Sequence, residues 1–143
     1  MMKNVELLKK FFTKDKYVAL SGITINEVDE DSAVVSVQLG EKHCNANGFA
    51  QGGLIYTLAD FAFAVLSNYK HPATVTQCGN ISYLRPATGE KLTATAREVE
   101  RAGHHNVCEV LIKNDSGKTV AIAQFNGFIK EMEEEELWKE ISK

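Results

Sequence analysis

One stretch of the sequence, residues 54–68, decides most of what this chain can fold into. It reads LIYTLADFAFAVLSN, and its apolar side chains would surround a helix nearly on all sides, which is typical of a helix buried in a core. No other long segment has this pattern, and most of the chain after His71 and Pro72 is β-rich. A twisted antiparallel sheet can cover a lone apolar helix by wrapping around it. The sequence therefore predicts an α+β fold with one long central helix.

The remaining elements follow from local periodicity. Before the central helix we expect a short amphipathic helix that ends before Tyr17, and then a hairpin of strands at about 22–28 and 33–39. After it we expect four strands, at about 73–85, 91–101, 106–114 and 119–130, and an acidic tail that is a solvated helix or a frayed end. The predicted organisation is a single domain, residues 1–143, with its core at about 22–130.

Charge and composition exclude several classes of protein. The formal net charge of −3 argues against a nucleic-acid binder, which needs clustered Lys and Arg in excess. No apolar window is long enough to span a bilayer, and residues 1–10 lack the apolar stretch of a signal peptide. Three scattered cysteines, Cys44, Cys78 and Cys108, suggest reduced thiols and not a disulfide framework. We expect a cytoplasmic protein without a membrane or nucleic-acid partner.

Asp60 is the residue that helix propensity and burial do not explain. It stands among Leu58, Ala59 and Phe61 in the helix expected to be most buried, and carboxylates are seldom buried without a partner or a task. A perturbed carboxylate favours an active site. The alternatives are that Asp60 caps a helix beginning only at Phe61, or that it faces solvent.

A second feature lies eight residues earlier, where Gln51, Gly52 and Gly53 join a loop to the helix. Glycine lets a ligand approach the backbone, and the free N–H groups of a helix N-terminus face developing negative charge. Such donors stabilise the oxyanion of an acyl-transfer reaction. A simple tight turn is the alternative interpretation.

The spacing of these features has a geometric consequence. Eight helical residues separate Gly52 from Asp60 by about 12 Å along the axis, whereas two groups that act on one carbonyl must both lie about 3 Å from it. If both serve the same carbonyl, they come from different subunits of a two-fold dimer.

Taken together, the motifs resemble the PaaI-like branch of the hot-dog thioesterases. The family carries an Asn, then His-Gly-Gly, then a helix containing Leu-Ala-Asp, and this chain has Asn45, Gln51-Gly52-Gly53 and Leu58-Ala59-Asp60. Residues 81–87, ISYLRPA, are similar to the family strand that ends in Leu-Arg-Pro-Ala. The resemblance covers about 110 residues, 22–130.

This resemblance implies a hot-dog fold and hydrolysis of an acyl-CoA thioester, with aryl and short or medium acyl chains as candidate groups. It implies that Asp60 is the nucleophile or general base, that Gly52 donates its N–H to the thioester oxygen, and that Asn45 positions water. Gln51, Gly53 and Thr76 are expected to contact substrate or water, although Gln51 stands where the family usually has His. Coenzyme A arrives with the substrate, and no metal or cofactor is implied. Tetramers of two dimers are usual in the family.

Two rival functions share this fold. A hot-dog hydratase or dehydratase would need a catalytic His five residues after the Asp, where this chain has Val65. A non-catalytic acyl-CoA sensor would lack the catalytic carboxylate, whereas Asp60 is present. The remaining histidines and cysteines show no typical zinc spacing, and we interpret them as surface residues. We interpret the basic residues of the strands in the same way and not as CoA ligands.

Overall fold

The chain forms, in order, two short N-terminal helices, a hairpin, one long helix, four further strands and a C-terminal helix. A computed structural model describes residues 4–71, 73–130, 132–141 and 143. Its elements, in chain order, are α1 (Val5–Phe12), α2 (Lys16–Ser21), β1 (Ile23–Val28), β2 (Ala33–Gln38), the 3₁₀ turn η1 (Glu41–His43), α3 (Gly52–Lys70), β3 (Thr74–Tyr83), β4 (Lys91–Ala102), β5 (His105–Asn114), β6 (Thr119–Ile129) and α4 (Glu134–Ile141).

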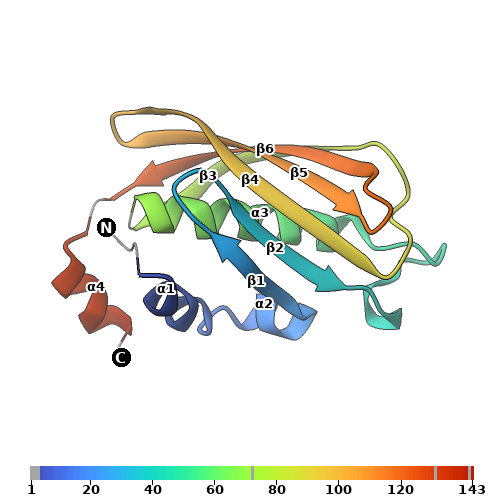
Figure 1. Cartoon of the computed structure of the whole chain (residues 1–143), viewed down its shortest axis with the longest axis horizontal. Coiled ribbons are helices and arrows are strands. Elements are labelled where there is room, and N and C mark those ends of the chain that lie inside the picture. The colour runs from blue at the N-terminus through green and yellow to red at the C-terminus, as the bar shows by residue number, and fades with distance from the viewer. Residues whose placement is uncertain (1–3, 72, 131, 142) are drawn as a thin grey trace.

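The six strands form one sheet that curves around α3 (Figure 1). Every neighbouring pair is antiparallel, in the order β1-β2-β4-β5-β6-β3. The predicted hot-dog architecture of an antiparallel sheet around one long helix is therefore confirmed. β3 follows α3 in the chain, yet it lies at one edge of the sheet and pairs with β6. Residues 84–90 consequently carry the chain from that edge back to β4 in the middle of the sheet.

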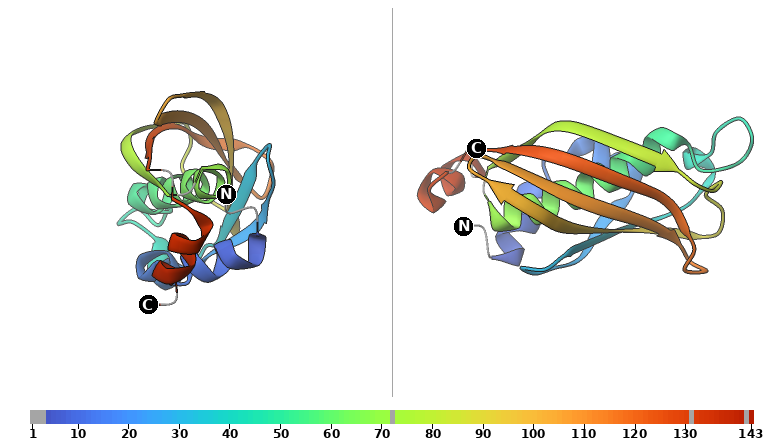
Figure 2. Two further views of the ribbon diagram at one scale, coloured as in Figure 1. Left: turned by 90° about the vertical axis from the view of Figure 1, so that its left-hand side faces the viewer. Right: turned by 90° about the horizontal axis from the view of Figure 1, so that it is seen from above.

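Burial of α3 on nearly all sides explains its apolar composition. The sheet covers one side of the helix, and the N-terminal helices lie against another (Figure 2). Phe12 of α1 and Phe61 of α3 meet edge to face, with ring centroids 5.1 Å apart. Leu58 and Phe63, like most apolar side chains of the helix, are almost completely buried. The predicted central helix is confirmed, and it begins two residues earlier, at Gly52.

The helix α2 was not expected, because the N-terminal helix was predicted to end before Tyr17. The side chain of Asp15 caps α2 by accepting a hydrogen bond from the N–H of Val18 at 3.0 Å. Gly22 ends it in the left-handed region, at φ 78°. The acidic tail forms α4, which lies near α1 (Figure 1), and Lys14 Nζ donates to the carbonyl oxygen of Glu140 at 2.6 Å.

Within the described part of the chain, no helix combines the length and hydropathy needed to cross a bilayer.

Candidate active site

The loop before α3 is built around Asn45. Its Oδ1 accepts hydrogen bonds from the N–H groups of Asn47 at 2.9 Å and Phe49 at 3.2 Å, and its own N–H donates to the carbonyl of Phe49 at 2.7 Å. Gly48 allows the turn by adopting φ 84°. The side-chain oxygen of Asn45 thus shapes the loop, and its amide nitrogen donates to no acceptor among the described residues.

Gln51 directly precedes α3. Its side-chain Oε1 accepts a short hydrogen bond from the N–H of Gly53, while its backbone N–H donates to the carbonyl of His43 at 2.8 Å. Gln51 is therefore the N-cap of the helix. The N–H of Gly52, one residue later, has no acceptor within residues 4–71 or the other described segments. A free N–H donor at the N-terminus of this helix agrees with the prediction from the sequence.

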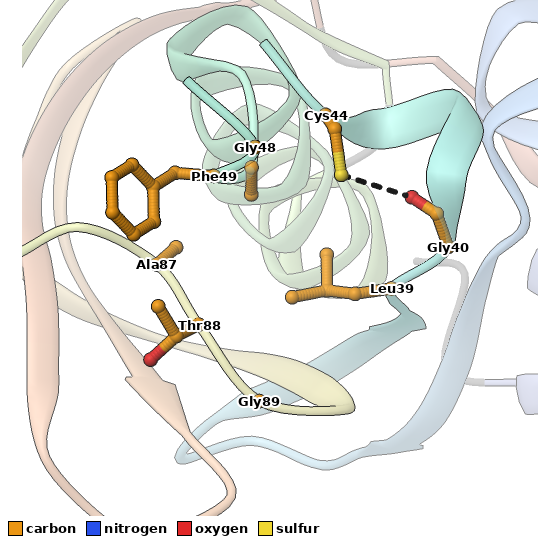
Figure 3. A pocket seen from close by; sticks show the side chains of 9 residues that line it. Leu39, Gly40, Cys44, Gly48, Phe49, Ala87, Thr88 and Gly89 are labelled. Carbon is orange, nitrogen blue, oxygen red and sulfur yellow. Dashed lines mark hydrogen bonds between the residues drawn. The ribbon is translucent and has the colours of Figure 1, made fainter. Parts of the chain in front are cut away.

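A cavity of about 360 Å³ brings Asn45 and Gly52 together. Its wall also includes Tyr83 from the end of β3, whose hydroxyl donates to the carbonyl oxygen of Gly52 at 2.8 Å. A second cavity, of about 240 Å³ (Figure 3), adjoins the first, because Phe49, Ala50 and Ala87 line both. Cys44 points into this second cavity, with its Sγ 3.6 Å from the carbonyl oxygen of Gly40 (Figure 3).

Asp60 lies two turns further along α3 and is half-buried. Its Oδ1 accepts a hydrogen bond from Thr76 Oγ1, on β3, at 2.9 Å. Burial raises the pKa of the Asp60 carboxyl above its ordinary value of 3.8; the Thr76 hydroxyl partly offsets this rise, and the charge of Asp15 adds to it. Asp60 is part of the continuous helix and does not cap one at Phe61. The carboxylate form of Asp60 is therefore poorly solvated.

The two halves of the predicted site do not meet within this chain. Asn45 and Gly52 share a cavity, and Asp60 is not among the residues that line it. Along the continuous helix, eight residues correspond to about 12 Å. The structure therefore separates the predicted oxyanion half of the site, with Gly52, from its predicted carboxylate half, with Asp60 and Thr76.

Two tyrosines belong to this region and were missed by the sequence prediction. Tyr56 lies one turn from both Gly52 and Asp60, so the three share a face of α3. Its hydroxyl reaches Gly79 on β3, where any Cβ would collide with it. Burial raises the pKa of Tyr56, and the nearby charges of Asp60 and Cys78 raise it further. The spacing of residues 52, 56 and 60 would have identified Tyr56, whereas no local signal identifies Tyr83.

Several of the residues excluded from the predicted site have structural contacts. The prediction that they lie on the surface is wrong for His43 and Cys108, which are buried. The ring of His43 joins η1 to α2: Nδ1 accepts from the N–H of Gly40 at 2.9 Å, and Nε2 lies 2.7 Å from the carbonyl oxygen of Ser21. His71 and Lys70 bind the carboxylate of Glu98, at 2.7 Å and 3.0 Å.

The sequence and the fold were compared with those of known proteins. Residues 47–121 match the thioesterase superfamily model. The chain is 34% identical over 122 residues to a putative esterase of Archaeoglobus fulgidus, covering 84% of this chain and 79% of that one. It is also 34% identical over 112 residues to the acyl-coenzyme A thioesterase PaaI of Escherichia coli, covering 78% and 80%.

Solved structures agree with this relationship. The structure of E. coli PaaI, from the phenylacetic acid degradation operon, matches with a TM-score of 0.83 and 30% identity over 89% of this chain and 93% of that chain. A Streptococcus mutans protein bound to acetyl-CoA matches with a TM-score of 0.74 and 26% identity, over 78% and 91%. This chain therefore belongs to the thioesterase superfamily, as a PaaI-like hot-dog thioester hydrolase.

Proposed function

We propose that the protein hydrolyses acyl-CoA thioesters, with aryl and short or medium acyl chains as the candidate substrates. The observation that carries the proposal is the half-buried carboxylate of Asp60, held beside Thr76 with its pKa raised. The free N–H of Gly52 supplies a matching oxyanion donor. The names of two relatives support the substrate class, since one is an acyl-coenzyme A thioesterase and another was solved with acetyl-CoA.

The proposed reaction uses each of the predicted site residues. The Gly52 N–H holds the thioester oxygen, and the negative charge that develops there in the transition state strengthens this hydrogen bond. Either the Asp60 carboxylate attacks the carbonyl carbon, or it removes a proton from a water molecule that attacks. When Asp60 attacks, the C–S bond breaks to leave a mixed anhydride on Asp60, and water then hydrolyses this anhydride to the free acid and the free carboxylate. When water attacks, the tetrahedral intermediate loses the sulfur and gives the free acid directly. In both routes the sulfur takes up a proton as free CoA leaves. The reaction needs no metal or cofactor.

The supporting residues have different proposed tasks. Asn45 offers its free amide nitrogen to water or substrate at the Gly52 cavity, and Thr76 orients the carboxylate of Asp60. Gly53 and Gln51 are hydrogen-bonded to each other. We assign these two to the support of the oxyanion half and not to direct contact with the acyl group.

We further propose that the active unit is a dimer in which Gly52 of one protomer faces Asp60 of the other. The distance along α3 requires two chains if both groups act on one carbonyl. β3 offers the interface, because this edge strand, TVTQCGNISY, contains neither a charged residue nor a proline to prevent pairing. Val75 and Tyr83 on it are exposed in the protomer. Exposed Leu111 and Ile122, paired on the outer face of the sheet, offer a second contact for a tetramer.

Release of free thiol from aryl, short-chain and long-chain CoA thioesters tests the activity. We expect Asp60→Asn and Asp60→Ala to lower turnover by at least about 10²-fold, the usual scale of lost acid–base catalysis. Glu109→Gln, an exposed carboxylate on β5, is the control and should leave turnover unchanged. Wild-type turnover in both Asp60 variants would refute the catalytic assignment. Binding of acyl-CoA without any hydrolysis would favour the sensor, and addition of water to an unsaturated acyl-CoA would favour the hydratase.

A hybrid dimer tests the shared site. In a heterodimer of Asp60→Ala with Gly52→Val, one of the two shared sites keeps both wild-type groups, so about half of the activity should return. If each site lay within one protomer, both would carry a defect and no activity would return. Separately tagged chains, purified as verified heterodimers, distinguish these outcomes.

The free thiols of Cys44, Cys78 and Cys108 agree with a cytoplasmic location, which we propose for the protein.

A further inference from the structure

The peptide unit between Gly52 and Gly53 is held at both of its polar atoms. Its carbonyl oxygen, on Gly52, accepts the hydroxyl of Tyr83 at 2.8 Å. Its N–H, on Gly53, donates to Oε1 of Gln51. One contact comes from the end of β3 and the other from the residue that caps α3, so two separate parts of the chain hold the same peptide plane.

The preceding peptide unit carries the free N–H of Gly52 and is held from the helix side. The carbonyl of Gln51, in the same plane, accepts from the N–H groups of Leu54 at 3.0 Å and Ile55 at 3.3 Å. Because a trans peptide is planar, the Gly52 N–H must point the opposite way, out of the helix N-terminus. Both planes that meet at the Cα of Gly52 therefore have fixed directions.

Glycine is the residue that most needs such restraint. Two successive glycines give the backbone more conformational freedom than any other pair, and an oxyanion donor acts best when it needs no reorganisation during the reaction. A side chain at either position would also press on the same two partners. A Cβ at position 52 would lie 3.3 Å from the Tyr83 ring, and one at position 53 would lie 2.7 Å from Gln51 Oε1.

From this geometry we propose that Tyr83 and Gln51 are positioning residues that fix the direction of the Gly52 N–H. The proposal rests on the thioester hydrolysis proposed above. It assigns the Gln at position 51 to the helix cap and to the orientation of its neighbour. It gives Tyr83, which touches the carbonyl of Gly52 and not the reacting atoms, an indirect effect on the rate.

Removal of the Tyr83 hydroxyl tests the first contact. Tyr83→Phe keeps the ring over Gly52 and loses only the hydrogen bond. We expect kcat to fall by about 10-fold, less than the 10²–10³-fold that follows loss of an oxyanion donor, while KM changes by less than about 2-fold because the affected interaction acts on the transition state. Tyr69→Phe, near the other end of α3, is the matched control and should keep the wild-type kcat.

Replacement of Gln51 tests the second contact. Gln51→Leu removes the acceptor and should lower kcat by a similar factor, whereas Gln51→Asn provides another N-cap oxygen and should recover most of the rate. The amide hydrogen of Gly53 should exchange faster in Gln51→Leu, which reports the loosened peptide without an assay of activity. Affinity for free CoA, which has no acyl carbonyl, should stay unchanged in all three variants.

The outcomes separate this proposal from the one it rests on. If the wild-type protein hydrolyses acyl-CoA and Tyr83→Phe keeps kcat within about 2-fold, or raises only KM, the positioning role is wrong and the proposed function stands. If the wild-type protein hydrolyses no thioester in the panel, both proposals are overturned.

Discussion

Two partly buried carboxylates lie along α3, and their surroundings differ in opposite ways. Near the C-terminal end of the helix, Glu98 of β4 accepts from Lys70 at 3.0 Å, His71 at 2.7 Å and Asn106 at 3.2 Å. In the middle of the helix, Asp60 accepts from the hydroxyl of Thr76, and no Lys, Arg or His among the described residues forms an ion pair with it.

The pKa values follow the partners. Burial tends to raise the pKa of Glu98, but the hydrogen bonds from Lys70 and His71 and the charge of His71 outweigh it, so the pKa is lowered from 4.5. Burial raises the pKa of Asp60, and one hydroxyl does not reverse the effect. Burial is common to both carboxylates, so the number and charge of the partners decide whether such a group stabilises the fold or remains reactive.

The largest expected effect on this contrast comes from Glu98→Gln, which removes the charge that Lys70 and His71 share. We expect the free energy of unfolding at pH 7 to fall by about 2–3 kcal/mol, since bonds to a charged group are lost inside the protein. Chemical denaturation measures this, with Glu109→Gln as the exposed control. Turnover per folded molecule should remain at the wild-type level, and a loss of turnover without a loss of stability would contradict the assignment.

Acid should remove the same contribution. Because the pKa of Glu98 is lower in the folded than in the unfolded state, its stabilisation is present above about pH 4.5 and is lost as the pH falls through the folded value. The stability difference between wild type and Glu98→Gln should therefore narrow on acidification.

The second effect is steric and concerns Asn106, which belongs to the network around Glu98. In Gly127→Ala, the new Cβ would lie 2.5 Å from Asn106 Oδ1 and 2.8 Å from the Phe63 ring. Asn106 is only 1% exposed, so there is little room to adjust, and the free energy of unfolding should fall by about 1–3 kcal/mol. Gly40→Ala is the control, because its Cβ would meet its nearest neighbour at 3.9 Å. Equal thermal stability of the two variants would show that the packing around Asn106 is loose.

The third effect is a gain in thermal stability when Asp60 is replaced. A carboxylate whose folded pKa is raised costs stability wherever it is ionised, and this cost disappears below its ordinary pKa of 3.8, where it is protonated in both states. Asn resembles the protonated form. Asp60→Asn should therefore raise Tm at pH 7 by on the order of a degree or two while turnover collapses. Thermal melts at pH 7 and pH 3.5 check this, and a lower Tm at pH 7 would mean that the ionised Asp60 stabilises the fold.

The smallest effect concerns the hydroxyl of Thr76, which donates a hydrogen bond to Asp60. Thr76→Val removes a hydrogen bond that lowers the pKa of Asp60, so the pKa should rise and the base form should need a higher pH. The acidic limb of the kcat/KM profile should move upward, with a loss of a few-fold below the limb and little above it. Thr57→Val, whose hydroxyl bonds within α3 at 2.8 Å, is the control. An unmoved limb would show that Asp60 does not set it.

The sequence predicted the region around Asp60 better than the network around Glu98. Asp60 and the Gly-Gly pair are conspicuous because a charge and two flexible residues contradict the local pattern of an apolar helix. The network around Glu98 joins the end of α3, at Lys70 and His71, to Glu98 and Asn106, which are more than 25 residues further along the chain. Each of these residues alone belongs to a type that is common on protein surfaces. Such contacts depend on strand register, which is set by the tertiary fold and not by local pattern.

The fold, too, was predicted in part. Period-two alternation identified the strands, and the apolar stretch identified α3. The position of β3 at the sheet edge was not predicted, because the local sequence of residues 84–90 does not determine which strand will pair with the strand that follows. Nor was α2 predicted, since its six residues depend on the cap from Asp15 and on tertiary contacts more than on periodicity.

The location of β3 also has a consequence for how the protein folds. On its outer side β3 pairs with no other strand among the described residues, and it lacks the charges and prolines that usually discourage association. A newly folded chain thus carries an open sheet edge to which extended segments of other molecules can pair. Refolding yield should therefore depend on how quickly the partner of the proposed dimer covers this edge, with aggregation as the competing outcome.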